Sequence, residues 1–102
     1  MKISKTIKKL NDRLNLAVKS IATQAKEEFN GLHDVTHTIQ FDLFPGSLLV
    51  TFMFETHDDL DKAISSQKRY QKRLQTLLLK QGVRLKEPKH NLTFTVLEKS
   101  AL

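Results

Sequence analysis

The chain has 102 residues, the usual length of one domain, and its 39% hydrophobic and 27% charged residues are an ordinary globular composition. It contains no cysteine, which excludes disulfides, thiolate metal sites and thiol nucleophiles and makes the cytoplasm the expected location. The formal net charge is +6, which favours polyanionic partners. We expect a single domain over residues 1–102 that is not a membrane protein. No apolar run approaches the ~20 residues that span a bilayer, and no secretory signal follows the basic N-terminus.

Charge is distributed unevenly along the chain. Residues 1–26 carry seven Lys or Arg and one acid, residues 27–61 carry eight acids and no Lys or Arg, and residues 62–102 carry ten Lys or Arg and two acids. No acid occurs between Lys62 and Lys86. The basic segments could therefore face an anionic partner, or the acidic middle could lie against them, within the chain or across a homodimer.

A long amphipathic helix is predicted at the start of the chain, because apolar residues recur there at steps of three and four up to Phe29. Gly31 is expected to end this helix as a C-cap. At about 100° per residue, most of the lysines fall opposite the apolar residues, so the outer face of the helix is expected to be basic. The apolar stripe consists of Ile3, Ile7, Leu10, Leu14, Ala17, Val18, Ile21, Ala25 and Phe29.

Two strands follow, and each has an apolar residue at every second position. The first covers residues 35–43 and the second covers residues 48–55, with a turn at residues 44–47. With Pro45 and Gly46 at the centre of that turn, both apolar sets share one face of the hairpin, and a two-residue or four-residue loop gives the same register. The expected pairs are Leu43 with Leu48, Phe41 with Val50, Ile39 with Phe52 and His37 with Phe54.

A second long helix is predicted from the N-cap Thr56, which is followed by acids in the first turn, to the expected C-cap Gly82. Its pattern shows no break. A basic loop at residues 84–89 leads to a third strand over residues 92–97, where apolar and polar residues alternate. The inner stripe of the helix consists of Leu60, Ala63, Ile64, Gln67, Tyr70, Leu74, Leu77 and Leu78.

The order of elements is therefore α-β-β-α-β, without a repeat or an internal linker. Two helices with one apolar stripe each and three strands with one apolar face each close most simply into a two-layer α+β domain. In that domain both long helices pack on one face of a three-stranded sheet, and both basic stripes face solvent. The opposite face of the sheet, around Leu49, Met53 and Leu97, is left open and is a candidate homodimer interface.

Residue types that carry catalysis or hold metals are not grouped in the sequence. The histidines His33, His37, His57 and His90 lack metal-ligand spacing. The paired carboxylates sit at helix ends, where capping and solvation account for them, and the three glycines are isolated. We therefore expect no enzyme activity, no metal, no cofactor and no small-molecule substrate. A membrane-surface role is not expected, because both apolar helix stripes are needed to cover the sheet.

The basic helix faces carry the functional prediction. Like charges at i, i+4, such as Arg69 and Arg73, repel each other by ~0.2–0.5 kcal/mol in an isolated helix. An anionic partner removes this repulsion, so we expect a non-enzymatic protein that binds nucleic acid, with RNA favoured, through backbone phosphates. The alternatives are a merely solubilising surface and a homodimeric protein–protein interaction module. The residues predicted to contact phosphates are Lys8, Lys9, Lys19, Lys62, Arg69, Arg73 and Lys80.

Residues 31–63 contain two short sequence motifs. One is Phe44-Pro45 followed by Ser47-Leu48 at the turn, and the other is Phe54-Glu55-Thr56 at the end of the second strand. In these motifs the chain resembles a family of short bacterial proteins often labelled Fis-type transcriptional regulators, and the similarity covers most of the chain. A Fis-type regulator is all-helical with a helix-turn-helix motif, for which the predicted strands leave no place.

The order of elements also resembles ribosome-binding factor A, whose type II KH-like domain opens with a helix, a β-hairpin and a helix. The stretches VTFMFETHDDLDKAI at residues 50–64 and GVRLKEPKHNLTF at residues 82–94 are similar to that family. The resemblance implies a KH-like fold and contact with ribosomal RNA. The absence of a Gly-x-x-Gly loop and the unbroken second helix depart from the pattern of a KH cleft that grips single-stranded bases.

Overall fold

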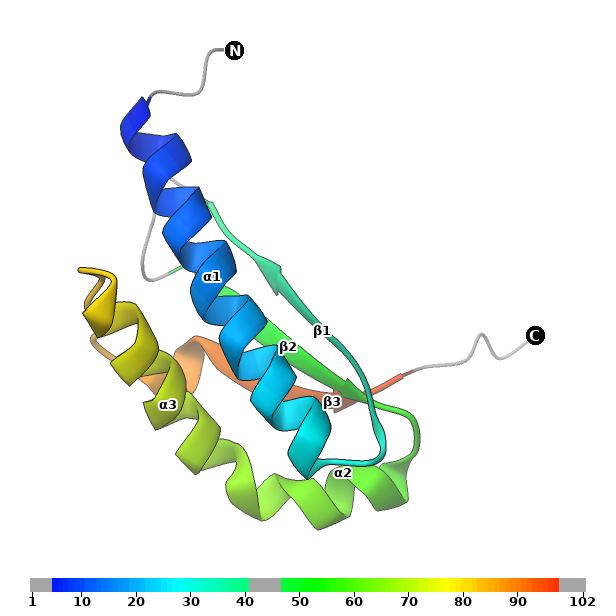
Figure 1. Ribbon diagram of the computed structural model, residues 1–102. Helices are drawn as coiled ribbons and strands as arrows, with labels where there is room; N and C mark the ends of the chain where they lie inside the picture. The colour runs from blue at the N-terminus through cyan, green and yellow to red at the C-terminus, as the bar shows by residue number, and fades with distance from the viewer. Residues whose placement is uncertain (1–4, 41–46, 98–102) are drawn as a thin grey trace.

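The computed structural model describes residues 5–40 and 47–97 and shows an α+β domain with a three-stranded sheet (Figure 1). The long helices lie on one face of this sheet, so the predicted two-layer architecture is confirmed. In chain order the elements are α1 (Lys5–Glu28), β1 (Leu32–Thr38), β2 (Leu49–Phe54), α2 (His57–Ala63), the 3₁₀ turn η2 (Ile64–Ser66), α3 (Gln67–Lys80), the 3₁₀ turn η3 (Pro88–His90) and β3 (Leu92–Val96).

The sheet has the strand order β1-β2-β3, so β2 is the central strand. β1 pairs with β2 antiparallel, whereas β3 pairs with β2 in parallel. A parallel pair requires a crossover connection, which the segment containing α2 and α3 supplies. Phe52 lies opposite Phe94 in this pairing, and their rings stack with centroids 5.0 Å apart. The third strand is therefore present, as predicted, and its apolar residues continue the apolar face of β2.

The predicted register of the hairpin is wrong by four residues. His37 pairs with Val50 instead of Phe54, and Val35 takes the place predicted for Ile39 opposite Phe52. Alternation fixes only which face a side chain occupies, and an even shift preserves that face, so the predicted shared apolar face is still found. The error came from assuming the shortest loop. The predicted pairing partners Phe41 and Leu43 lie outside the described residues.

The connection between β1 and β2 is longer than the predicted turn. Ser47 Oγ accepts a hydrogen bond from the Gln40 backbone N–H at 3.0 Å and donates one to the Gln40 carbonyl at 2.7 Å. These two bonds join residues 40 and 47, whereas the predicted two-residue loop would join residues 44 and 47. The connection is therefore four residues longer than predicted. The Phe44-Pro45-Gly46 part of the predicted turn lies outside the described residues.

The core lies between the helices and the inner face of the sheet. Tyr70 of α3 is buried at its centre, with its ring 5.4 Å from those of both Phe29 and Phe52. The predicted α1 stripe is buried from Leu14 to Ala25, and Phe29 is partly buried against the core. Ile3 and the side chain of Ile7, which were also placed in that stripe, lie outside the described part. The buried apolar residues are Leu14, Ala17, Val18, Ile21, Ala25, Leu48, Val50, Phe52, Phe54, Ala63, Tyr70, Leu74, Leu78, Val83, Leu85, Leu92 and Phe94.

The second helix is not continuous, contrary to the prediction. It breaks at Ile64–Ser66, which form a 3₁₀ turn between α2 and α3. Two consecutive serines favour such a break, because their hydroxyls compete for backbone hydrogen bonds. A 3₁₀ turn advances about 120° per residue against about 100° in an α-helix, which rotates the following face. Gln71, after the turn, is buried as a result, whereas Ile64, which was predicted to be in the core, lies in the turn itself and is 46% exposed.

The helix caps are correct at two of the three predicted positions. Thr56 is the N-cap of α2, since its Oγ1 accepts a hydrogen bond from the Asp59 N–H at 3.1 Å. Gly82 ends α3 in the left-handed region with φ of +83° and donates its N–H to the Leu79 carbonyl at 3.0 Å. Gly31 does not adopt a positive φ. A side chain at Gly31 would overlap the Asp59 carboxylate, so it would require that carboxylate to move.

Candidate nucleic-acid interface

The seven bases predicted to contact phosphates are all exposed, but they lie on three different helices. Lys8, Lys9 and Lys19 are on α1, and Lys62 is on α2. The other three, Arg69, Arg73 and Lys80, are on α3. Lys62 stands apart from this set, because its Nζ is 3.2 Å from Oδ2 of Asp58 and its charge is compensated there.

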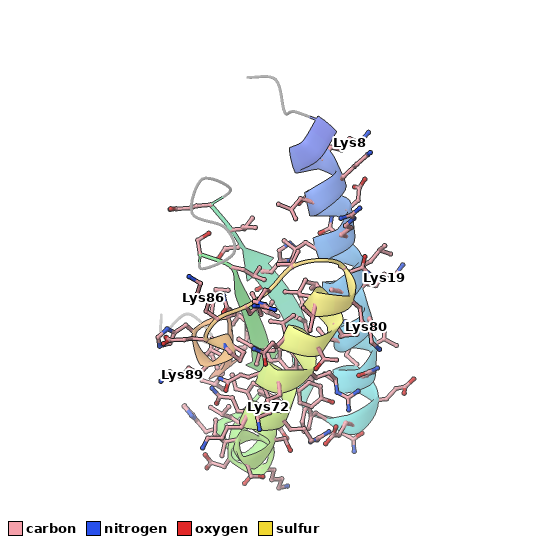
Figure 2. The ribbon with its side chains drawn as sticks, turned by 90° about the vertical axis from the view of Figure 1, so that its left-hand side faces the viewer. Lys8, Lys19, Lys72, Lys80, Lys86 and Lys89 are labelled. Atoms are coloured by element: carbon pink, nitrogen blue, oxygen red, sulfur yellow. The ribbon has the colours of Figure 1, made fainter. Side chains whose placement is uncertain are left out.

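Further bases adjoin those of α1 and α3. Figure 2 shows lysines spread over the side of the molecule that α3, α1 and the loop after α3 form together. The loop is tied to α3 by Gln75, whose Nε2 donates to the Leu85 carbonyl at 2.9 Å, and by Gln71, whose Nε2 donates to the Leu92 carbonyl at 2.9 Å. We call this surface the basic face and define it by the labelled lysines Lys8, Lys19, Lys72, Lys80, Lys86 and Lys89, together with Lys68, Arg73 and Arg84, which line grooves along α3 and the loop.

The sequence prediction omitted the loop residues Arg84, Lys86 and Lys89 from the site. Their basic character was visible in the sequence. Their position beside α3 depends on the hydrogen bonds of Gln71 and Gln75 to backbone carbonyls of the loop and β3, which no local pattern specifies. The sequence offers no signal for this contact, because Gln71 lies outside the predicted inner stripe and its burial goes with the unpredicted break in the helix.

Few of the bases are neutralised by the chain's own acids. Among the Lys and Arg side chains that the structure describes, two have a carboxylate partner: Lys62 pairs with Asp58, and Arg69 pairs with Glu28. Acids of residues 27–61 therefore form ion pairs with described Lys or Arg side chains at these two points. Within residues 5–40 and 47–97, the bases of the basic face form no ion pair with a carboxylate.

The contact between α1 and α3 is built around Glu28. Its carboxylate accepts a hydrogen bond from the Tyr70 hydroxyl at 2.7 Å and another from the Arg69 guanidinium. One helical turn away, Nη1 of Arg73 donates to Oε1 of Gln24 at 2.7 Å. The Tyr70 ring lies under both guanidinium groups, with Cζ of Arg69 at 5.0 Å and Cζ of Arg73 at 6.0 Å from its centroid.

These contacts fix the protonation states at the helix contact. The hydrogen bond from Tyr70 lowers the pKa of Glu28, and Arg69 lowers it further. Burial, together with the bond to Glu28, raises the pKa of Tyr70 to about 12. The same ion pair raises the pKa of Arg69. At neutral pH the contact therefore consists of a carboxylate, a neutral phenol and a guanidinium, whose charges sum to zero.

A groove of about 380 Å³ runs between α1 and α3 next to this contact. It is basic along its length, because one wall carries four cationic side chains and only Arg69 among them has a carboxylate partner in the described residues. The lining residues are Gln24 of α1 and Arg69, Lys72, Arg73, Thr76, Leu77 and Lys80 of α3.

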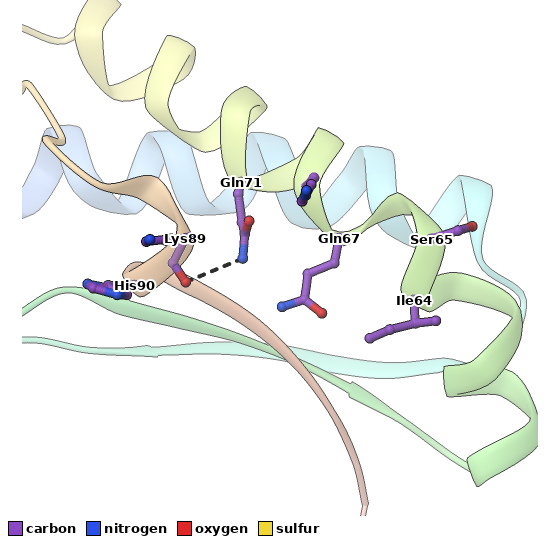
Figure 3. Close-up of a pocket in the computed structure, with 7 residues that line it drawn as sticks. Ile64, Ser65, Gln67, Gln71, Lys89 and His90 are labelled. Atoms are coloured by element: carbon purple, nitrogen blue, oxygen red, sulfur yellow. Dashed lines mark hydrogen bonds between the residues drawn. The ribbon is translucent and has the colours of Figure 1, made fainter.

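A second groove, of about 520 Å³, lies where the helix breaks (Figure 3). The exposed side chain of Ile64 and the amide of Gln67 lie between the start of α3 and the segment that enters β3. Lys68 and Lys89 also line this groove and add positive charge to it, and the Gln71 amide donates to the Lys89 carbonyl at 3.4 Å. An apolar surface, hydrogen-bonding groups and cations thus line one groove. Ser65 and His90 complete it.

The other predicted features are placed as follows. His33 lies 3.4 Å from a Glu55 carboxylate oxygen and His90 lies 3.1 Å from one of Glu87. In residues 5–40 and 47–97, no three His, Asp or Glu side chains form a group able to hold a metal ion. None of the helices described in those ranges has the length and apolar character needed to cross a bilayer. Leu49, Met53 and Leu97 remain partly exposed.

Comparison with known proteins gives no family assignment. No protein family, curated protein or solved structure matches this chain. The resemblances to Fis-labelled proteins and to ribosome-binding factor A therefore stay predictions. The charge of the basic face and the shape of its two grooves are the features of the molecule that bear on function.

Proposed function

We propose that this protein binds nucleic acid, RNA in preference to DNA, by contacting backbone phosphates with the basic face. The observation that carries the proposal is that, among the residues the structure describes, no carboxylate forms an ion pair with a base of the basic face. Of the described bases on α3, Arg69 pairs with a carboxylate, while Lys68, Lys72, Arg73 and Lys80 do not. Neighbouring like charges on one helix repel, and phosphate groups relieve that repulsion while releasing counterions from the nucleic acid.

The groove at the helix break supports RNA with an unpaired segment as the partner. Ile64 offers an apolar surface to an unstacked base, and Lys68 and Lys89 flank it with charge for the adjoining phosphates. The side chains of Ser65 and Gln67 supply hydrogen-bonding groups of the kind that recognise a 2′-hydroxyl. The resemblance to ribosome-binding factor A points in the same direction.

The test is fluorescence anisotropy with an end-labelled, mixed-sequence RNA of about 20 nucleotides and DNA of the same sequence, titrated between about 50 and 200 mM salt. For single strands the logarithm of the binding constant should fall with log salt by about 0.7 for each phosphate contacted. We expect tighter binding to RNA. Binding that is absent, or that does not depend on salt, would overturn the proposal.

A matched pair of substitutions tests the surface itself. Lys72→Gln removes a charge of the basic face, whereas Lys62→Gln removes the same charge from the pair with Asp58. We expect Lys72→Gln to reduce the salt slope by about 0.7 and Lys62→Gln to leave it unchanged. Equal effects of the two substitutions would show that net charge alone governs binding.

The homodimer alternative makes a different prediction. If Leu49, Met53 and Leu97 are covered by a second copy, sedimentation equilibrium should give twice the mass of the chain, and Met53→Lys should restore the monomer mass. The nucleic-acid proposal requires neither result, because the basic face lies on the helices and the loop.

A further inference from the structure

Two arginines one helical turn apart on α3 have partners of different charge on α1. Arg69 donates to the carboxylate of Glu28, and Arg73 donates to the amide oxygen of Gln24 at 2.7 Å. Glu28 and Gln24 are themselves one turn apart, so the two pairs form consecutive rungs between the helices. The rungs have similar chemistry, but one contains a negative charge and the other does not.

This difference decides which arginine is available to an anion. The carboxylate of Glu28 compensates Arg69 and would repel a phosphate placed beside it. The amide of Gln24 engages one N–H of Arg73 without forming an ion pair, so its remaining donors stay available, although Arg73 also lowers the pKa of Glu28 through its charge. Contact with the Tyr70 ring, 6.0 Å from Cζ of Arg73, helps to fix the orientation of the guanidinium. A side chain that is already oriented loses less conformational entropy when it binds.

We infer that Arg73 anchors a phosphate subsite in the groove between α1 and α3, and that Gln24 keeps it available while Glu28 removes Arg69 from the site. Lys72 and Lys80 line the same groove and bring two more uncompensated charges to the phosphate. This inference rests on the proposed function and deepens it. It names Arg73 as the residue that contacts a phosphate of the nucleic acid, and Gln24 and Glu28 as the residues that decide which arginine can do so.

Substitutions that exchange carboxylate and amide test the inference with both arginines still present. Gln24→Glu should neutralise Arg73 as Glu28 neutralises Arg69, and we expect RNA affinity to fall about tenfold, as for loss of one charge-assisted hydrogen bond. Arg73→Gln should have an effect of the same size. The matched control is Gln40→Glu, the same chemical change at an exposed residue two positions after the end of β1. It should change affinity by less than about twofold.

The pair formed by Arg69 and Glu28 gives the complementary test. The double variant Arg69→Gln/Glu28→Gln removes a neutral pair and leaves the net charge at +6. We expect its RNA affinity to equal that of the original chain within about twofold. The single variant Glu28→Gln should bind more tightly, because Arg69 then becomes available. Circular dichroism of each variant checks that it is folded.

The outcomes separate the inference from the proposed function. If RNA binds in a salt-dependent manner but Gln24→Glu behaves like Gln40→Glu, the subsite is wrong and the proposed function stands. A double variant that loses affinity as strongly as Arg73→Gln would likewise overturn the subsite. If the unsubstituted chain does not bind RNA or DNA, the proposed function fails and the subsite fails with it.

Discussion

The Tyr70 hydroxyl donates a hydrogen bond to the Glu28 carboxylate at 2.7 Å, which links the aromatic core of the domain to the end of α1. The ring of Tyr70 is buried against Phe52, and the exposed residues Arg69 and Arg73 place their guanidinium groups over the same ring. One side chain therefore supports both the packing of the two layers and the geometry of the candidate interface.

Removing this hydroxyl should destabilise the domain without opening a cavity. We expect Tyr70→Phe to lower the free energy of unfolding by about 1 kcal/mol, the usual contribution of one hydrogen bond. Tyr70→Ala also removes the buried ring and should cost about 3–5 kcal/mol. Urea unfolding followed by circular dichroism measures both. A Tyr70→Phe variant as unstable as Tyr70→Ala would contradict the assignment of a single hydrogen bond's contribution to the hydroxyl.

Stability should fall in acid as Glu28 becomes protonated. The folded state holds the pKa of Glu28 below its ordinary value of 4.5. Between the folded and unfolded pKa values, the unfolded chain binds more protons, so stability there rises with pH. The contribution of Glu28 is therefore fully present above about pH 4.5 and is lost as the pH falls through the folded pKa. Urea unfolding at a series of acidic pH values should show a smaller loss in Glu28→Gln.

Stability should also fall at high pH because of Tyr70. Its pKa is raised from 10.0 to about 12 in the folded state, which favours the neutral phenol. In that range the folded state binds more protons than the unfolded state, so stability decreases as the pH rises from about 10 to about 12. Tyr70→Phe lacks the titrating group and should show a flatter profile over the same range. Identical profiles for the two proteins would contradict the assignment.

A side chain at Gly31 should displace the Asp59 carboxylate at a cost in stability. Gly31→Ala places a methyl group where the Asp59 carboxylate lies, and we expect a loss of about 1–3 kcal/mol in unfolding free energy, as for other overpacked sites. The variant Gly31→Ala/Asp59→Ala should recover most of that loss, apart from the cap contact that Asp59 makes with Thr56. Additive effects of the two substitutions would show that they do not meet.

Ile64 should contribute little to stability and more to binding. Because its side chain is 46% exposed, we expect Ile64→Ala to cost less than about 1 kcal/mol, against about 2–5 kcal/mol for the fully buried Leu74→Ala. The affinity of Ile64→Ala for single-stranded RNA should fall, while its affinity for duplex RNA should not, because only an unpaired base reaches the groove. Anisotropy with the two RNAs distinguishes these results.

Local patterns in the sequence predict the elements well and their mutual placement less well. Alternation identified the strands and their inner faces, because side chains of a strand alternate strictly between faces. The same alternation is unchanged by the four-residue shift that places Val50 opposite His37, so the register was not predictable from it. The break at Ile64–Ser66 was missed because the apolar spacing continues across it.

The candidate site was predictable in its charge but not in its pairing. Periodicity placed Arg69 and Arg73 on one outward face, and both are exposed there. That Arg69 meets Glu28, 41 residues earlier in the chain, and Arg73 meets Gln24 depends on how α1 packs beside α3. The packing of α1 beside α3 is a tertiary property, so it cannot be predicted from the spacing of residues within either helix.

The parallel pairing of β3 with β2 has a consequence for synthesis of the chain. β2 can form its hairpin with β1 as soon as residues 32–54 have left the ribosome, but its other edge stays open until residues 92–96 have been made. During that interval an unsatisfied edge and the apolar face of Phe52 are exposed together, which is the combination that favours aggregation. Chains truncated before Leu92 should therefore accumulate in the insoluble fraction.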